Sequence, residues 1–363
     1  MKSLVIEAGV AVLLALWLSS AAGTESVHIY NWTDSIGRTT LKDFQQVTGL
    51  LPVYDVFESN EMLDAKLLAG KSGYDVVVPS NNFLAKQIRA GAFQPLDKNK
   101  LQNWNNLDPD ILQLLQVVDP GNQYGVPYLG GSVGIGYNVD KIKAILGLEK
   151  IESWATVFEP RNIEQLSQCG VAILDSPDEL FAVMLNYLGL DPNSSEIKDY
   201  KLAQEKLLLI RPYITYFHSA KYISDLANGN ICVAIGYSGD IYQAAARAQE
   251  AGKDIDISYS LPKEGSKLAY DMLAIPADAQ NPDAALAFID YILRPEVIAR
   301  ISEDVGYPNP NYKSYSLISR ELLDNPMVFP EITAKKQLFV ATPLPFAIQR
   351  FATRSWAQIK SGR

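Results

Sequence analysis

The feature that most constrains this fold is a regular alternation of strand-like and helix-like segments. A first series places strands at 27–30, 53–57 and 75–79 and helices at 41–49, 62–68 and 83–89. A second series places strands at 126–128, 171–174, 230–236 and 271–276 and helices at 177–189, 241–251 and 282–293. The run 75–79 is almost entirely apolar, which suits a parallel strand covered on both faces. This rhythm predicts an α/β fold with doubly wound sheets.

The first 22 residues have the pattern of a cleavable signal peptide. Lys2 gives a positive start, the apolar run 8–18 follows, and small residues end the segment at 19–23. The apolar run is too short to span a bilayer. No cysteine lies near the cleavage point, so a lipid anchor is not indicated. We therefore expect residues 1–22 to be removed and the mature protein to be exported and soluble.

The length of the mature chain indicates its number of lobes, and its charge indicates the kind of partner it binds. Removing 22 of 363 residues leaves 341, more than one hydrophobic core usually holds, so two lobes are expected. The net charge is -9, and it is unchanged by cleavage because Lys2 and Glu7 leave together. An acidic balance argues against nucleic acids and anionic membranes, and it weakly favours a cationic partner.

Two cysteines, Cys169 and Cys232, are a candidate disulfide in an exported chain. A metal site is the weaker alternative, since two widely spaced cysteines and only two histidines, His28 and His218, cannot assemble a zinc tetrad. We expect a structural disulfide and neither a metal nor a cofactor.

Acidic and aromatic residues gather at the predicted strand ends and nearby loops, where α/β sheets bind ligands. They are Trp32, Thr33, Asp34, Ser80, Glu179, Tyr237, Asp240, Asp271 and Tyr307. Ring faces attract ammonium groups, and carboxylates form charge-assisted hydrogen bonds with them. A linear diamine needs acids at both ends and apolar walls between them. Single aspartates at such places also cap helices, so this pattern leaves helix capping and packing open as alternatives.

Short motifs occur along the whole mature chain. They are 28–34 (HIYNWTD), 54–57 (YDVF), 77–80 (VVPS), 93–97 (FQPLD), 134–141 (GIGYNVDK), 185–189 (LNYLG), 222–236, 291–296, 353–356 (TRSW) and 360–362 (KSG). Through these motifs the chain resembles periplasmic polyamine-binding proteins, in particular putrescine binders of ATP-driven (ABC) importers. The resemblance covers essentially the whole mature chain. It implies a type II periplasmic binding protein fold, with 27–132 and 271–304 in one lobe and 133–270 and 305–363 in the other.

The resemblance also implies roles for the candidate residues. Trp32, Thr33 and Asp34 would line one wall with Ser80 beside them, and Tyr307 would close the side. Glu179, Asp240 and Asp271 would hold the ammonium ends. Cys169 and Cys232 match the family's cysteine pair.

This sequence departs from the family pattern at several positions. Ser35 stands where these binders carry Tyr, Tyr237 replaces a Trp, and Ala269 and Gly130 lack bulky aromatics. Ser176 occupies a place where spermidine binders have Asp, while Asp240 matches the putrescine type. The acids therefore favour a diamine, although the thinner walls could admit a longer or substituted amine.

The sequence favours a binding protein over an enzyme. The glycine cluster 131–136 has the wrong spacing for a dinucleotide site and suits a crossing strand near a hinge. No nucleophile–base pair is evident, so a hydrolase using Asp34, Glu179 or Asp271 is disfavoured. We expect a monomeric periplasmic protein that delivers putrescine or a related diamine to an inner-membrane ABC permease. A spermidine-preferring binder and a polyamine sensor that docks on a membrane receptor are the alternatives.

Overall fold

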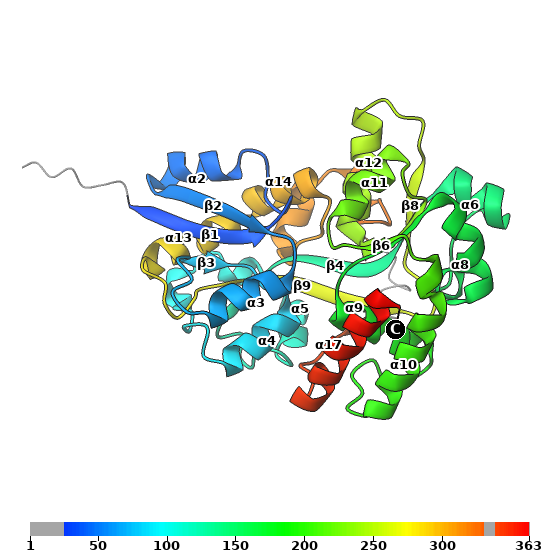
Figure 1. The fold of residues 1–363 in the computed structure, drawn as a ribbon. Helices are drawn as coiled ribbons and strands as arrows, with labels where there is room; N and C mark the ends of the chain where they lie inside the picture. Colours follow the sequence, from blue (N-terminus) through cyan, green and yellow to red (C-terminus); the bar gives the residue numbers. More distant parts are fainter. Residues whose placement is uncertain (1–24, 330–337, 363) are drawn as a thin grey trace, which may run out of the picture.

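The computed structural model describes residues 25–329 and 338–362, arranged as two α/β lobes side by side (Figure 1). The predicted signal peptide, residues 1–22, lies outside the described residues. Two long strands, β4 (Gly125–Asn138) and β9 (Ser266–Ala274), run from one lobe into the other. The two-lobed α/β arrangement expected from the sequence is confirmed.

The sheet of the first lobe has the strand order β2-β1-β3-β9-β4. Strands β1 (Ser26–Trp32), β2 (Leu51–Phe57) and β3 (Val76–Val77) are parallel, and β9 joins β3 in the opposite direction. The helices of this lobe are α2 (Thr40–Thr48), α3 (Asn60–Leu68), α4 (Asn81–Arg89), α5 (Pro109–Leu115), α13 (Pro282–Ile292) and α14 (Pro295–Val305). Two apolar clusters, one around Phe44 and one around Leu63, form its core.

The second lobe repeats this plan. Strands β7 (Val233–Tyr237), β5 (Val171–Ile173) and β6 (Tyr216–Phe217) are parallel, and β4 pairs with β7 in the opposite direction. Strand β8 (Ile257–Ser260) pairs with the other edge of β4 and runs antiparallel to it. The helices are α6 (Val139–Leu146), α7 (Ala155–Phe158), α8 (Pro160–Leu166), α9 (Pro177–Tyr187), α10 (Ile197–Ile210), α11 (Lys221–Asn228) and α12 (Ser238–Glu250).

Local sequence signals explain where individual helices begin and end. The Ser59 hydroxyl accepts a hydrogen bond from the Met62 amide and so caps the start of α3. Helix α2 ends at Gly49, which adopts φ +76°, a left-handed conformation that glycine takes without steric cost. The start of α3 and the end of α2 are therefore set by the local sequence.

The glycine cluster 131–136 lies within β4, as the crossing-strand interpretation predicted. Residues 125–132 of this strand pair with β9, whereas residues 133–138 pair with β7 and β8. A side-chain carbon on Gly134 would collide with the Tyr259 ring, and one on Gly136 would collide with Ile241. The glycines therefore allow close packing where the strand passes between the lobes.

The C-terminal segment is predicted to belong wholly to the second lobe from residue 305, and its first part contacts the first lobe. The Pro310 carbonyl accepts from the Asp108 amide, and Asn311 Nδ2 donates to the Leu293 carbonyl, both in the first lobe. Helix α15 (Arg320–Leu323) packs there too, since Leu322 belongs to the same apolar cluster as Ala299 of α14. Strand β10 (Leu338–Val340) then pairs with β9, and α17 (Phe346–Ser361) packs on α9 and α10. We propose that the chain returns to the second lobe after α15.

Candidate functional site

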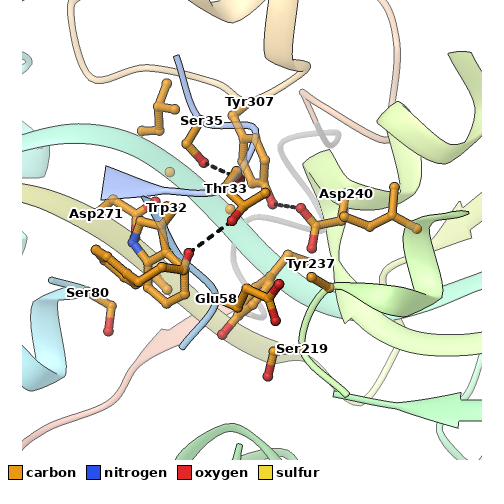
Figure 2. A pocket seen from close by; sticks show the side chains of 17 residues that line it. Trp32, Thr33, Ser35, Glu58, Ser80, Ser219, Tyr237, Asp240, Asp271 and Tyr307 are labelled. Carbon is orange, nitrogen blue, oxygen red and sulfur yellow. Dashed lines mark hydrogen bonds between the residues drawn. The ribbon is translucent and has the colours of Figure 1, made fainter. Parts of the chain in front are cut away.

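A cavity lies between the two lobes, and residues from both contribute to its walls (Figure 2). The first lobe supplies the residues that follow β1 and β2, and the crossing strands β4 and β9 supply the floor. The second lobe supplies the end of β7, the start of α12 and the start of α11. None of the described residues that line this cavity is basic, so it is open to a cationic ligand.

Seven of the nine predicted site residues line this cavity. They are Trp32, Thr33, Ser80, Tyr237, Asp240, Asp271 and Tyr307. Asp34 and Glu179 are not among its lining residues, and each forms an ion pair instead.

Asp240 lies in the first turn of α12 and has two phenol donors. The Tyr307 hydroxyl donates to Oδ1 over 2.7 Å, and the Tyr222 hydroxyl donates to Oδ2. Burial raises the pKa of Asp240 to about 6, although these two hydrogen bonds lower it. The carboxyl group is thus held in one orientation while its negative charge lacks the solvation of open water.

Asp271 faces the cavity from the opposite side. It lies inside β9, not at the start of a strand as the sequence suggested, because β9 begins at Ser266 rather than at residue 271. A bridge between Asp271 and Ser80 attaches it to the end of β3. Burial, and then the charge of Asp240, raise the pKa of Asp271 well above its usual range. Two carboxyl groups, one from each lobe, therefore share one cavity with no cation of the protein between them.

Tyr307 is fixed between two glycines. A side-chain carbon on Gly131 of β4 or on Gly239 of α12 would collide with its ring. Glycine at both positions lets the ring reach the cavity and place its hydroxyl on Asp240.

Aromatic rings line much of the remaining wall. The Trp32 ring contacts the Phe57 ring at a centroid distance of 4.6 Å, and Tyr237 lies across the cavity. A side-chain carbon on Gly130 would lie 2.6 Å from the Tyr270 ring, so Tyr270 occupies the space that a bulky residue at position 130 would need. The Tyr270 ring therefore fills the space beside Gly130, whereas Ala269 and Ser35 present small side chains to the cavity.

Asp34 links the two lobes at the surface. Its carboxylate contacts Arg247 of α12 over 2.6 Å, and Gln243 of α12 donates to its backbone carbonyl over 3.3 Å. A second bridge joins Asn82 of α4 to Asp178 of α9 over 3.3 Å. The lobes are therefore in contact across the cavity, and Asp34 serves that contact rather than the cavity wall.

Glu179 lies in the first turn of α9 with its side chain almost fully buried. Its Oε1 accepts from the Lys267 ammonium over 2.7 Å. This pairing partner lies in β9, 88 residues along the chain, and Glu179 is not among the residues that line the cavity.

Several lining residues were not anticipated from the sequence. Glu58 directly follows β2, Ser219 and Ala220 directly precede α11, and Ile223 lies in its first turn. Glu58 is half exposed, and its carboxylate lies 3.9 Å from His218 of the second lobe. The strand-end rule that picked out Asp34 after β1 would also have found Glu58 after β2.

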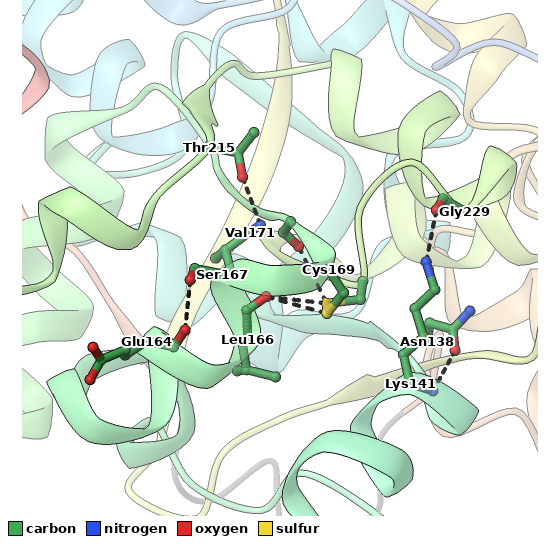
Figure 3. Close-up of a disulfide and its surroundings, with 11 residues drawn as sticks. Asn138, Lys141, Glu164, Leu166, Ser167, Cys169, Val171, Thr215 and Gly229 are labelled. Atoms are coloured by element: carbon green, nitrogen blue, oxygen red, sulfur yellow. Dashed lines mark hydrogen bonds between the residues drawn. A yellow bond between two sulfur atoms is a disulfide. The ribbon is translucent and has the colours of Figure 1, made fainter.

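Cys169 and Cys232 form a disulfide, as predicted (Figure 3). Cys169 ends the short helix η3 (Ser167–Cys169), and Cys232 directly precedes β7. Neither cysteine lines the cavity, so the bond supports the second lobe rather than the site.

The part of the chain that the structure describes contains no cluster of His, Cys, Asp and Glu suited to a metal ion. Within those same residues, no helix combines the length and apolarity needed to cross a bilayer.

Comparison with known proteins agrees with this geometry. Residues 41–330 match the family model of the bacterial extracellular solute-binding proteins. The chain is 53% identical over 347 residues to the putrescine-binding periplasmic protein SpuD of Pseudomonas aeruginosa, with 95% of each chain covered. It is 49% identical over 345 residues to the putrescine-binding periplasmic protein PotF of Escherichia coli, which covers 94% of this chain and 93% of PotF.

The fold is also similar to that of a solved structure. A putative spermidine/putrescine ABC transporter from Listeria monocytogenes superposes with a TM-score of 0.82 at 29% identity, covering 93% of this chain and 100% of that one. The predicted periplasmic binding protein fold is thereby confirmed. The chain belongs to the family of bacterial extracellular solute-binding proteins.

Proposed function

We propose that this protein captures a polyamine, putrescine or a related diamine, in the periplasm and delivers it to an inner-membrane ABC importer. One observation carries the proposal: Asp240 and Asp271 reach the same cavity from opposite lobes, and no lining residue among those described is basic. Two carboxylates joined by aromatic walls fit two ammonium groups joined by methylenes. The putrescine-binding relatives support the same ligand class.

The proposed contact set follows the cavity. Asp240 and Asp271 bind the two ammonium ends, the rings of Trp32, Tyr237 and Tyr307 cover the methylenes, and Thr33 and Ser80 add polar contacts. We add Glu58, at the mouth of the cavity, to this contact set. Asp34 acts through its bond to Arg247, which holds the lobes together.

The carboxyl groups also explain how ligand and closure are coupled. Closing the lobes buries Asp240 and Asp271 together, and burial disfavours both of their negative charges. A dication compensates these charges, so it binds the closed form better than the open form and shifts the population toward closure. Closure of this kind is a binding event and needs no chemical step, so we propose that the protein is not an enzyme.

Diamine affinity is expected to fall as the pH is lowered through about 6. The pKa of Asp240 is raised to about 6 in the closed form, so below this pH a proton competes with the ligand ammonium for the carboxylate. Protonation of Asp240 alone should raise the dissociation constant by up to about tenfold per pH unit on the acid side, and protonation of Asp271, whose pKa burial also raises, adds to that rise. Calorimetry with putrescine between pH 7.5 and 5.0 measures this, and a constant affinity over that range would contradict it.

A thermal-shift panel tests the proposed function directly. Putrescine, cadaverine, agmatine, spermidine and spermine are each added to the mature protein. A ligand at a hundredfold excess over its dissociation constant stabilises the fold by about 2.7 kcal/mol, and putrescine is expected to give one of the largest shifts. The proposal is wrong if none of the five amines raises the melting temperature.

A spermidine-preferring binder is the second candidate. Glu58 brings a third carboxylate to the mouth of the cavity, and Ala269 and Ser35 present small side chains to it. The largest thermal shift with spermidine would favour this candidate. A sensor that docks on a membrane receptor would bind the same amines, but its deletion would leave putrescine uptake unchanged.

A further inference from the structure

The most deeply buried ion pair among the described residues lies beside the cavity and not in it. The Lys267 side chain is 0% exposed and that of Glu179 is 2% exposed. The second carboxylate oxygen of Glu179, Oε2, is buried and has no hydrogen-bond partner within the described residues. Desolvating two charges offsets most of their attraction, so a buried pair of this kind adds little net stability to the fold.

The position of Lys267 connects the pair to the ligand site. Side chains two residues apart in a strand point to the same face, so Lys267, Ala269 and Asp271 share one face of β9. Ala269 and Asp271 line the cavity, and Lys267 is the next residue along that face. Ala269 is small, so little side-chain volume separates the pair from the cavity.

Glu179 acts electrostatically on the cavity from behind its wall. Burial raises the pKa of Tyr237, and the carboxylate of Glu179 adds to that rise. It also contributes to the raised pKa of Asp271, after burial and the charge of Asp240. The Glu179 carboxylate influences Tyr237 and Asp271, which line the cavity, so it is close enough to interact with a charge on a bound ligand. In this structure the Lys267 ammonium neutralises that carboxylate.

We infer that Lys267 is a built-in counter-cation that occupies Glu179 and so tunes the cavity toward ligands with two positive charges. The Lys267 ammonium takes the place that a third ligand ammonium would otherwise fill. Asp240 and Asp271 then remain as the two enclosed acceptors. This inference rests on the proposed function, since it concerns which amine the same site prefers.

The test replaces the lysine by an uncharged side chain of similar length. In Lys267→Met, Glu179 is left unpaired, so the affinity for spermidine should rise relative to the affinity for putrescine. Two unit charges several ångströms apart in a protein interior interact strongly enough to change the affinity ratio about tenfold. Calorimetry with both amines at pH 7.5 gives the ratio for the wild type and for each variant.

A matched double variant separates charge from packing. Lys267→Met with Glu179→Gln keeps the altered shape but removes both charges, so its affinity ratio should return to within about threefold of the wild type. An unchanged ratio in folded Lys267→Met would overturn the inference, as would a double variant that keeps the spermidine gain.

Glu179→Gln alone provides a second route, because it keeps Lys267 and leaves its charge unpaired near the cavity. Putrescine affinity should then fall about tenfold through repulsion, and an unchanged affinity in the folded variant would also overturn the inference. If the wild type binds neither amine, the proposed function itself fails. If it binds putrescine but the ratios do not move, only the role of Lys267 is wrong.

Discussion

Asp240→Asn is expected to raise the dissociation constant for putrescine about tenfold or more, a loss of about 1.4 kcal/mol at the lower limit. The amide carries no charge, so it loses the charge-assisted hydrogen bond to a ligand ammonium. Its NH₂ group would also face one of the two phenols that now donate to the carboxylate, Tyr222 or Tyr307. Both effects weaken the ligand-bound closed form.

The same substitution is not expected to lower the stability of the ligand-free protein. Burial raises the pKa of Asp240, which means that its ionised form is disfavoured in the closed state. Removing the charge relieves this cost, which offsets the phenol hydrogen bond that the amide loses, so the melting temperature of the ligand-free protein should be unchanged or higher. This combination of weaker binding and undiminished stability distinguishes a ligand contact from a structural residue.

Asp254→Asn is the matched control for this experiment. Asp254 is exposed in the loop between α12 and β8, and the substitution changes the net charge by the same amount. Calorimetry should give wild-type affinity for this variant. Equal affinities in Asp240→Asn and Asp254→Asn would remove Asp240 from the site.

Removing the disulfide is expected to cost about 4 kcal/mol of unfolding free energy while leaving diamine affinity nearly unchanged. The bond joins residues separated by 63 positions, and closing a loop of that length restricts the unfolded chain strongly. Cys232 precedes β7 and Tyr237 ends it, so the length of that strand separates the bond from the cavity. The stabilisation therefore acts on the second lobe and not on the ligand contacts.

Urea unfolding of the Cys169→Ala, Cys232→Ala double variant measures this loss. Wild-type protein treated with a reductant during unfolding should reproduce the lower midpoint, which controls for the packing of the alanines. A variant with wild-type stability, or one with strongly weakened putrescine binding at a temperature where it is folded, would contradict the prediction.

Much of the fold follows from local patterns in the sequence. Apolar runs gave the strands β1, β2 and β5 within one or two residues of their observed ends, and the glycine cluster indicated the crossing strand β4. The first half of β9 was missed because Ser266 and Lys267 interrupt the apolar pattern. The fully buried side chain of Lys267 is tolerated in this strand because Glu179 pairs with it, and that partner is not visible in the local sequence.

The same reasoning explains which site residues could be predicted. Asp240 and Tyr237 follow directly from the position at the end of a strand, since the fold brings such ends to one edge. Asp34 and Glu179 fit that rule equally well, but Arg247 and Lys267 bind them from segments 213 and 88 residues away. A rule based on local position predicts where a carboxylate lies, whereas its ionic partner depends on the tertiary fold.

The two shared strands have a consequence for how the chain is assembled. Strand β9 lies between β3 and β4, so the sheet of the first lobe lacks an interior member until residues 266–274 have been synthesised. Helices α13 and α14, which cover that sheet, come later still. The N-terminal half of the chain therefore cannot complete the first lobe on its own, because that lobe depends on segments that follow nearly the whole second lobe in the sequence.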